Sequence, residues 1–189
     1  MTVVANALGT CDWRPTLLLL TVVVPAAVCD VLTRRIFNAI TYPGIVAGFA
    51  LNGWLAGWAG VSDAGLGFAA GFGPLLVAYL IGGYGGGDAK LMGAVGAIGG
   101  AWTAVSVLMY ALLLGVAMGL IETIWRGRMR ATLWRTARAA WLVLAGGRPG
   151  DPVGPHSIQV RLGLAIALGS VWHLAEAHSG RTLWDWLVG

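Results

Sequence analysis

The sequence predicts an all-α, polytopic membrane protein with about six transmembrane helices. Of its 189 residues, 58% are hydrophobic and only 11% are charged, whereas soluble domains carry about a quarter charged residues. The 30 glycines and 10 tryptophans are typical of helices that pack closely in lipid with aromatic rings at the interfaces. Apolar segments recur along the whole chain, and most are near the roughly 20 residues that a helix needs to cross the hydrocarbon.

These segments predict one membrane-embedded domain over residues 1–189. The expected spans are about 15–31, 39–60, 64–83, 88–101, 102–125 and 157–178. Only Gly99 and Gly100 mark the boundary between the fourth and fifth spans. The first span lacks a basic start and a small-residue cleavage site, so it is not expected to be a signal peptide.

The positive charges predict the orientation of these spans. The loops after the first, third and fifth spans, together with Arg161 at their edge, contain ten of the twelve Lys and Arg residues. Arg14 and Arg181 lie on the other side. Because loops rich in Lys and Arg stay in the cytoplasm, we expect residues 30–38, 84–90 and 126–157 to be cytoplasmic and both termini to lie outside.

The loop at about 126–156 is the most basic part of the chain. Over residues 128–145, Arg alternates with Leu, Trp and Ala at near-helical spacing, which favours an amphipathic helix on the anionic inner leaflet and makes membrane lipid a partner. Docking of an acidic partner or substrate is the alternative interpretation. Nucleic-acid binding is not expected.

Most of the eight acids have simple explanations. Glu122 is expected to pair with Arg126 one helical turn later. Four acids are expected in loops or termini as solvated surface charges, namely Asp12, Asp63, Asp151 and Asp185.

Asp30 and Asp88 are the candidates for catalysis. Individually, Asp30 could pair with Arg34 on the same helix, and Asp88 could cap the helix that follows it. Both acids, however, fall at span ends on the same predicted side of the membrane, where charges are costly. Two carboxyl groups that share one proton can activate water and protonate a peptide carbonyl, the chemistry of an aspartic protease.

The glycines before Asp88 fit this chemistry. Gly85, Gly86 and Gly87 have no Cβ, so they would let an extended peptide substrate approach the acid closely. A phosphate-binding loop is not supported, because no GxxxxGK[ST] pattern is present. No metal or cofactor is expected, since Cys11 and Cys29 form no CxxC pair.

The segment "GGGDAKLMGAVG" (85–96) resembles the GxGD signature of membrane-embedded aspartyl proteases, and more narrowly the Gly-Asp-x-Lys-Leu segment of type IV prepilin peptidases. Gly85, Gly87 and Asp88 match the GxGD positions, and Lys90 matches the basic residue that follows.

Two further segments share this resemblance. In "DVLTRRIFN" (30–38), Asp30 and Asn38 match the family's first motif, with Phe37 at its usual proline. "VRLGLAIALG" (160–169) resembles a segment near the last span, with Arg161 at another expected proline.

The resemblance implies a six-helix endopeptidase of the bacterial inner membrane that removes the basic leader from prepilin or pseudopilin substrates at the cytoplasmic face. Asp30 and Asp88 would be catalytic, and the glycines with Lys90 and Asn38 would support them. The chain looks like the short, peptidase-only type of tight-adherence (Flp-like) pilus systems, so N-methyltransferase activity is not expected.

Several alternatives stay open. Lys90 could reach lipid phosphates or tune the two acids. In "HLAEAH" (173–178), a metal site would need a better-oriented third ligand. The favoured interpretation is that these are polar residues at the membrane interface. The same acids could instead serve a small proton- or cation-coupled transporter, or the chain could be a catalytically silent assembly subunit.

Overall fold

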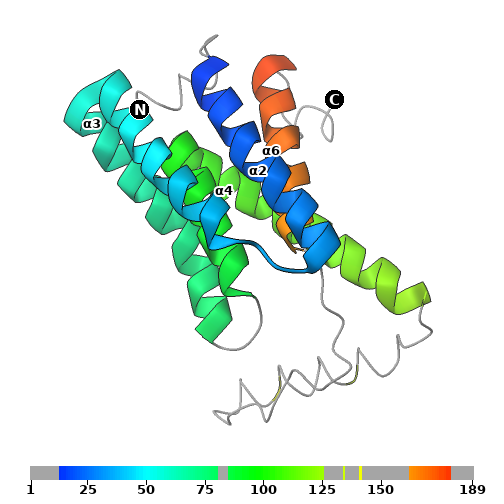
Figure 1. The fold of residues 1–189 in the computed structure, drawn as a ribbon. Helices are drawn as coiled ribbons and strands as arrows, with labels where there is room; N and C mark the ends of the chain where they lie inside the picture. Colours follow the sequence, from blue (N-terminus) through cyan, green and yellow to red (C-terminus); the bar gives the residue numbers. More distant parts are fainter. Residues whose placement is uncertain (1–12, 81–84, 126–133, 135–140, 142–161, 180–189) are drawn as a thin grey trace.

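The computed structural model describes residues 13–80, 85–125, 134, 141 and 162–179 (Figure 1). The helices of these residues are α2 (Trp13–Thr33), α3 (Asn38–Leu80), α4 (Gly86–Trp125) and α6 (Leu162–Ser179). By length and composition, α2, α3 and most of α4 could each cross a membrane, and α6 is apolar but shorter. The expected all-α membrane fold is thus confirmed for the described residues, while the basic segment 126–156 falls almost wholly outside them.

The expectation of six separate transmembrane helices is not confirmed. The segments expected at 39–60 and 64–83 are joined in α3, and those expected at 88–101 and 102–125 are joined in α4. The reason is that each junction is a single non-helical glycine, Gly57 (φ 59°, ψ −139°) in α3 and Gly100 (φ 81°, ψ −179°) in α4. Such positive φ angles are accessible to glycine without strain, so no separate loop is needed.

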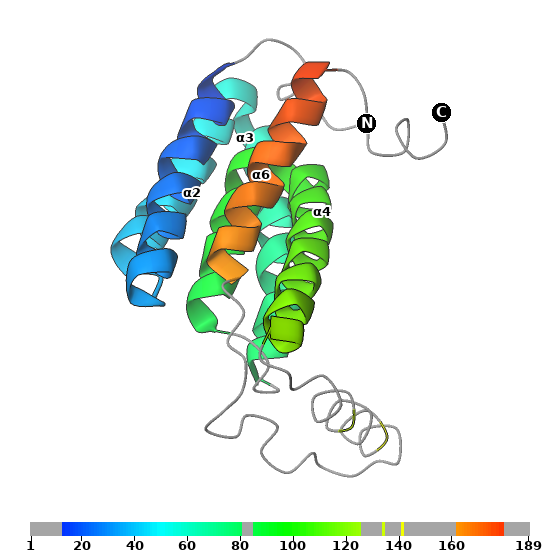
Figure 2. The same cartoon turned by 90° about the vertical axis from the view of Figure 1, so that its right-hand side faces the viewer.

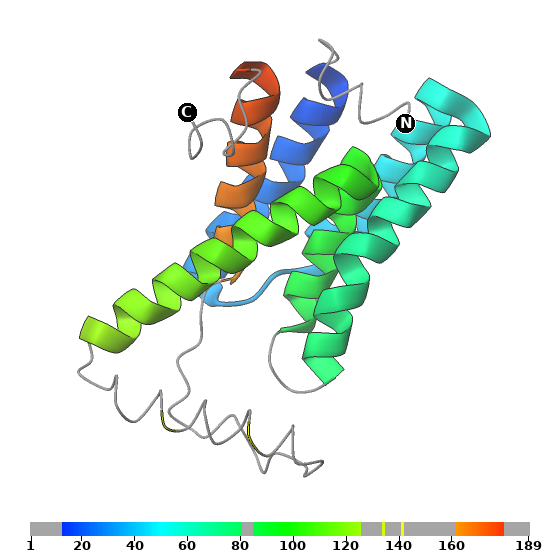
Figure 3. The same cartoon turned by 180° about the vertical axis from the view of Figure 1, so that it is seen from behind.

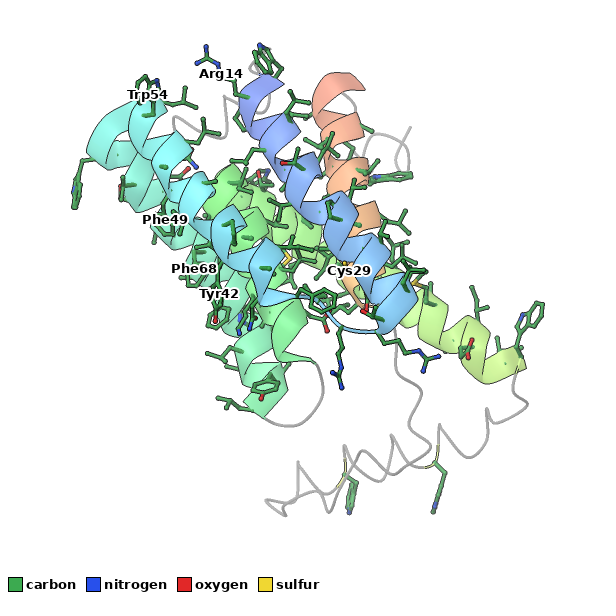
Figure 4. All side chains as sticks on the ribbon, viewed as in Figure 1. Arg14, Cys29, Tyr42, Phe49, Trp54 and Phe68 are labelled. Carbon is green, nitrogen blue, oxygen red and sulfur yellow. The ribbon has the colours of Figure 1, made fainter. Side chains whose placement is uncertain are left out.

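At Gly57 the chain reverses, and the two arms of α3 lie side by side (Figure 1). The rings of Phe49 and Phe68, one on each arm, are 6.4 Å apart between centroids and both are labelled in Figure 4. Gly60 packs directly against the backbone of Asn52. The chain also turns at Gly100, and Figure 3 shows the two arms of α4 diverging from this bend.

Two polar side chains of α3 stabilise the interrupted backbone of α4 at Gly100. Asn52 donates from Nδ2 to the carbonyl oxygens of Ala97 (2.8 Å) and Ile98 (3.1 Å), just before the break. Asp63 hydrogen-bonds the backbone of Ala101, just after it. Since lipid offers no hydrogen bonds to a broken helix, these contacts let α4 bend inside an apolar bundle.

The position of Asp63 corrects the sequence-based expectation of a solvated surface charge. Asp63 lies within the second arm of α3 and is only 7% exposed. Its Oδ2 packs against Gly100 so closely that a Cβ there would lie 2.5 Å away. The expectation was wrong because the turn at Gly57 is one residue long, so Ser62 and Asp63 belong to a helix rather than to a loop.

The first arm of α4 forms the centre of the bundle. Residues 91–100 are all buried, and α4 contacts each of the other described helices. Small residues allow this, because a Cβ on Gly67 or Gly96 would overlap the backbone of the other. Large apolar side chains such as Leu32, Trp54 and Trp58 remain exposed on the outside, as expected for a surface that faces lipid.

The end of α2 and the beginnings of α4 and α6 gather at one end of the bundle (Figure 2). Cys29 and Tyr42 lie toward this end in Figure 4, whereas Arg14 and Trp54 lie at the opposite end. The candidate catalytic residues are therefore carried by helix ends on the same side of the protein.

Candidate active site

Asp30 lies in the last turn of α2 and is 7% exposed. Its carboxyl oxygen Oδ2 accepts a hydrogen bond of 3.1 Å from the backbone N–H of Leu164, the third residue of α6. The first N–H groups of a helix have no partner within that helix, and they favour negative charge. The beginning of α6 thus provides a polar partner for a carboxylate that is otherwise enclosed.

Asp30 and Arg34 are joined by a backbone hydrogen bond, which is different from the side-chain ion pair that the sequence allowed. Arg34 N donates to the carbonyl oxygen of Asp30 at 3.0 Å, and Arg34 adopts a left-handed conformation (φ 55°). This geometry ends α2 in the manner of a C-terminal αL motif. The carboxyl group of Asp30 remains available to α6.

Asp88 is the third residue of α4 and is partly buried. It is not the capping residue that one sequence interpretation suggested. Its side chain instead reaches back to the backbone of Gly85, the residue before the helix, and its own N–H donates to the carbonyl oxygen of Gly85 at 3.1 Å. This reciprocal arrangement resembles a capping box and fixes the carboxyl group at the helix N-terminus.

The structure brings Asp30 and Asp88 together. Although 58 positions separate them in the sequence, their charges lie close enough to interact electrostatically. One comes from the end of α2 and the other from the beginning of α4. Two neighbouring carboxyl groups do not readily ionise together, because each negative charge disfavours the other.

The three glycines before Asp88 lie close to the protein's own chain. A Cβ on Gly87 would lie 3.1 Å from Cβ of Ile36, in the connection between α2 and α3, and one on Gly86 would lie 3.4 Å from the Tyr79 ring. Gly85 is exposed, and a Cβ there would lie 3.0 Å from Oδ2 of Asp88. Gly87 therefore admits the connection between α2 and α3, a Cβ on Gly86 would make only ordinary contact with Tyr79, and Gly85 leaves the front of the Asp88 carboxyl group open.

Lys90 and Asn38, which the sequence grouped as supporting residues, contact each other. Lys90 Nζ donates to Oδ1 of Asn38 at 3.0 Å and lies 5.0 Å from the centroid of the Tyr42 ring. This contact is additional to the two roles that the sequence suggested for Lys90, and both roles stay predictions. The contact ties the first turns of α3 and α4 together and thereby fixes the connection that packs on Gly87.

Sequence reasoning missed Gly163 and Leu164, although both lie in the segment 160–169 that resembles a family segment. A Cβ on Gly163 would lie 2.8 Å from Oδ2 of Asp30 and 3.0 Å from its Cβ. A single glycine six residues after the expected start of the last span is a weak signal, and a backbone N–H donor leaves no trace in sequence at all.

The polar residues near the end of α6 form a separate group. Glu176 accepts hydrogen bonds from the hydroxyl of Tyr110 (2.6 Å) and from Nε1 of Trp172 (3.1 Å). Within the described part of the chain, no three His, Cys, Asp or Glu residues gather as a metal site would require. The side chain of His178 lies outside that part.

Comparison with known protein families gives one match. The model of the type IV leader peptidase family matches residues 17–120, a stretch that includes Asp30, Asp88 and the glycines before it. No curated protein and no solved structure matches the chain. The matched stretch covers more than half of the sequence, and the protein therefore belongs to the type IV leader peptidase family, whose members are proteases.

Proposed function

We propose that the protein is an aspartic endopeptidase of the membrane in which Asp30 and Asp88 are the catalytic residues. The observation that supports this most directly is the electrostatic proximity of the two carboxyl groups across the ends of α2 and α4. Family membership supports the protease class, and the pair supplies the two groups that peptide hydrolysis without a metal requires.

In the proposed reaction, one carboxyl group is ionised and the other holds a proton. The ionised group takes a proton from water, whose oxygen attacks the peptide carbonyl carbon, while the protonated group donates to the carbonyl oxygen. The tetrahedral intermediate then expels the amine, which receives a proton from the pair. Gly85 leaves space for a substrate backbone, whereas Gly86, Gly87, Lys90 and Asn38 hold the surrounding segments.

We further propose that the substrate is the leader of a prepilin-like protein, since the family acts on type IV leaders. Such a leader would be basic and would reach the pair from the cytoplasm. Arg34 and Arg35, next to Asp30, support that orientation, because positively charged connections remain on the cytoplasmic side. The bacterial inner membrane is the proposed location, and removal of the leader without N-methylation is the proposed reaction.

The reversals at Gly57 and Gly100 support six membrane crossings, one for each arm of α3 and α4 together with α2 and α6. With 43 residues, α3 would be about 65 Å long if straight, roughly twice the 30 Å hydrocarbon thickness. Folding back at Gly57 halves this length, so each arm suits one crossing.

The direct test replaces each acid by its amide. Asp30→Asn and Asp88→Asn should each reduce cleavage of a co-expressed prepilin at least about a thousandfold, because removing a member of a catalytic unit eliminates its chemistry. Immunoblots would separate precursor from product, and the mass of the new N-terminus would reveal any methylation. Glu122→Gln, the same change of acid to amide elsewhere on α4, should cleave normally.

Normal processing by either Asp variant would disprove the catalytic role of the Asp30 and Asp88 pair. The transporter alternative would be favoured if the unaltered protein cleaved no prepilin but carried ions or solutes across vesicle membranes, and if both Asp variants abolished this flux.

A further inference from the structure

The beginning of α6 lies against Asp30 and outside the stretch that matches the family model. We propose that Gly163 and the backbone N–H of Leu164 are positioning residues that hold the Asp30 carboxyl group in its reactive orientation. This inference rests on the proposed function, in which Asp30 takes part in the chemistry.

The contact has two components. The N–H of Leu164 donates to Oδ2 of Asp30 at 3.1 Å, which fixes one carboxyl oxygen and leaves the other to act on water or substrate. Gly163 is buried, and a Cβ there would meet Oδ2, Cβ and Cγ of Asp30 at 2.8 to 3.0 Å. Only a residue without a side chain lets α6 approach near enough to make the hydrogen bond.

The surrounding contacts make this docking rigid. Leu162, Ala165 and Ile166 on α6 are buried in the core, and α6 packs against both α2 and α4. The first turn of α6 therefore cannot shift without disturbing the two helices that carry Asp30 and Asp88. Catalysis is sensitive to such shifts, because a misplacement of about 1 Å can reduce a rate about a hundredfold.

The first experiment compares two glycines of α6 that both pack tightly. Gly163→Ala places a methyl group against Asp30, whereas Gly169→Ala places one 3.1 Å from Cβ of Tyr110, away from the acids. With purified protein in lipid nanodiscs and a synthetic prepilin peptide, Gly163→Ala should lower kcat about 10- to 100-fold. Its KM should change less than about twofold, because the added methyl group does not alter the contacts that bind the substrate. Gly169→Ala should retain its kcat per folded molecule.

The second experiment removes the hydrogen bond itself. Leu164→Pro deletes the N–H at a first-turn position where a helix needs no donor, and Leu164→Ala shortens the side chain but keeps the N–H. The proline variant should have a kcat at least about tenfold below that of the alanine variant, the size expected for one charge-assisted hydrogen bond. This ratio decides the question if Gly163→Ala does not accumulate.

A third measurement needs no activity. In a background without Cys11 and Cys29, the pair Asp30→Cys and Gly163→Cys should form a disulfide, because the two Cβ positions lie 3.0 Å apart, near the roughly 3.5–4.5 Å of real disulfides. The pair Asp30→Cys and Gly169→Cys, about 9 Å further along α6, should not.

The outcomes separate the two proposals. Normal kcat in Gly163→Ala and equal kcat in the two Leu164 variants would overturn the positioning role and leave the protease intact. Failure of the disulfide would overturn the placement of α6. If the unaltered protein cleaves no prepilin peptide while the disulfide forms, the proposed function is wrong and the positioning role falls with it, although the docking of α6 stands.

Discussion

At the scale of single residues, the sequence was informative where chemistry required a particular side chain. Asp30 and Asp88 were selected because charged groups at membrane-span ends are costly, and Lys90 and Asn38 because they match the family's motifs. Their catalytic and supporting roles stay predictions. The mutual contact of Lys90 and Asn38 was not predictable, since it depends on how closely the first turns of α3 and α4 approach. Asp63 was misjudged because a polar pair between apolar runs suggested a loop.

The contact between Lys90 and Asn38 can be measured by a double-mutant cycle. Lys90→Met and Asn38→Ala each remove the hydrogen bond, so their effects on the free energy of unfolding should couple by about 0.5–1.5 kcal/mol. Lys90→Met combined with Gly73→Ala, where an added Cβ meets nothing within 4 Å, should be additive. Unfolding in mixed detergent micelles provides the measurement, and additivity of the first pair would contradict the contact.

At the scale of elements, Asn52 and Asp63 of α3 hold the bend of α4 from its two sides. One arm supplies an amide donor to the carbonyl groups before Gly100, and the other supplies a carboxyl acceptor to the N–H after it. The sequence marked the break through Gly99 and Gly100, because consecutive glycines interrupt helices. The partners of the broken backbone lie about 40 residues earlier and could not be inferred from local pattern.

These contacts predict losses of stability of different size for two changes at Asp63. Asp63→Asn keeps an oxygen that accepts from Ala101, so the free energy of unfolding should fall by less than about 0.5 kcal/mol. Asp63→Ala leaves that N–H without a partner and should destabilise the protein by about 1–2 kcal/mol. Thermal unfolding in one detergent compares both variants, and equal stability would contradict the capping role.

The donor on the other arm gives a matching prediction. Asn52→Leu preserves volume but leaves the carbonyl groups of Ala97 and Ile98 without their donor, which should destabilise the protein by about 1–3 kcal/mol. The same unfolding measurement applies. The control is Ala59→Ser, at an exposed position near the turn, which should leave the free energy of unfolding unchanged.

At the scale of the whole molecule, composition was enough to predict a helical membrane protein, whereas the joining of spans into α3 and α4 was not foreseen. Hydropathy detects apolar length but cannot distinguish a loop from a one-residue turn. The proposed orientation, based on the charge distribution, places the end that carries Asp30 and Asp88 in the cytoplasm and the reversals at Gly57 and Gly100 outside.

This orientation can be tested with single cysteines in a background without Cys11 and Cys29. Phe37→Cys lies beside the candidate active site, and Ala59→Cys and Trp102→Cys lie near the two reversals, all at exposed positions. In intact spheroplasts, a membrane-impermeant thiol reagent should label residues 59 and 102 but label residue 37 only after lysis. Labelling of all three from one side would exclude a crossing by each arm.

The docking of α6 on Asp30 also bears on where this enzyme can be divided. The family model ends at residue 120, forty-odd positions before the helix that grips the first acid. A fragment cut at that border would keep the two motifs around Asp30 and Asp88 but lack the segment 160–169. If α6 positions Asp30 as proposed, the smallest active unit is expected to extend well beyond residue 120.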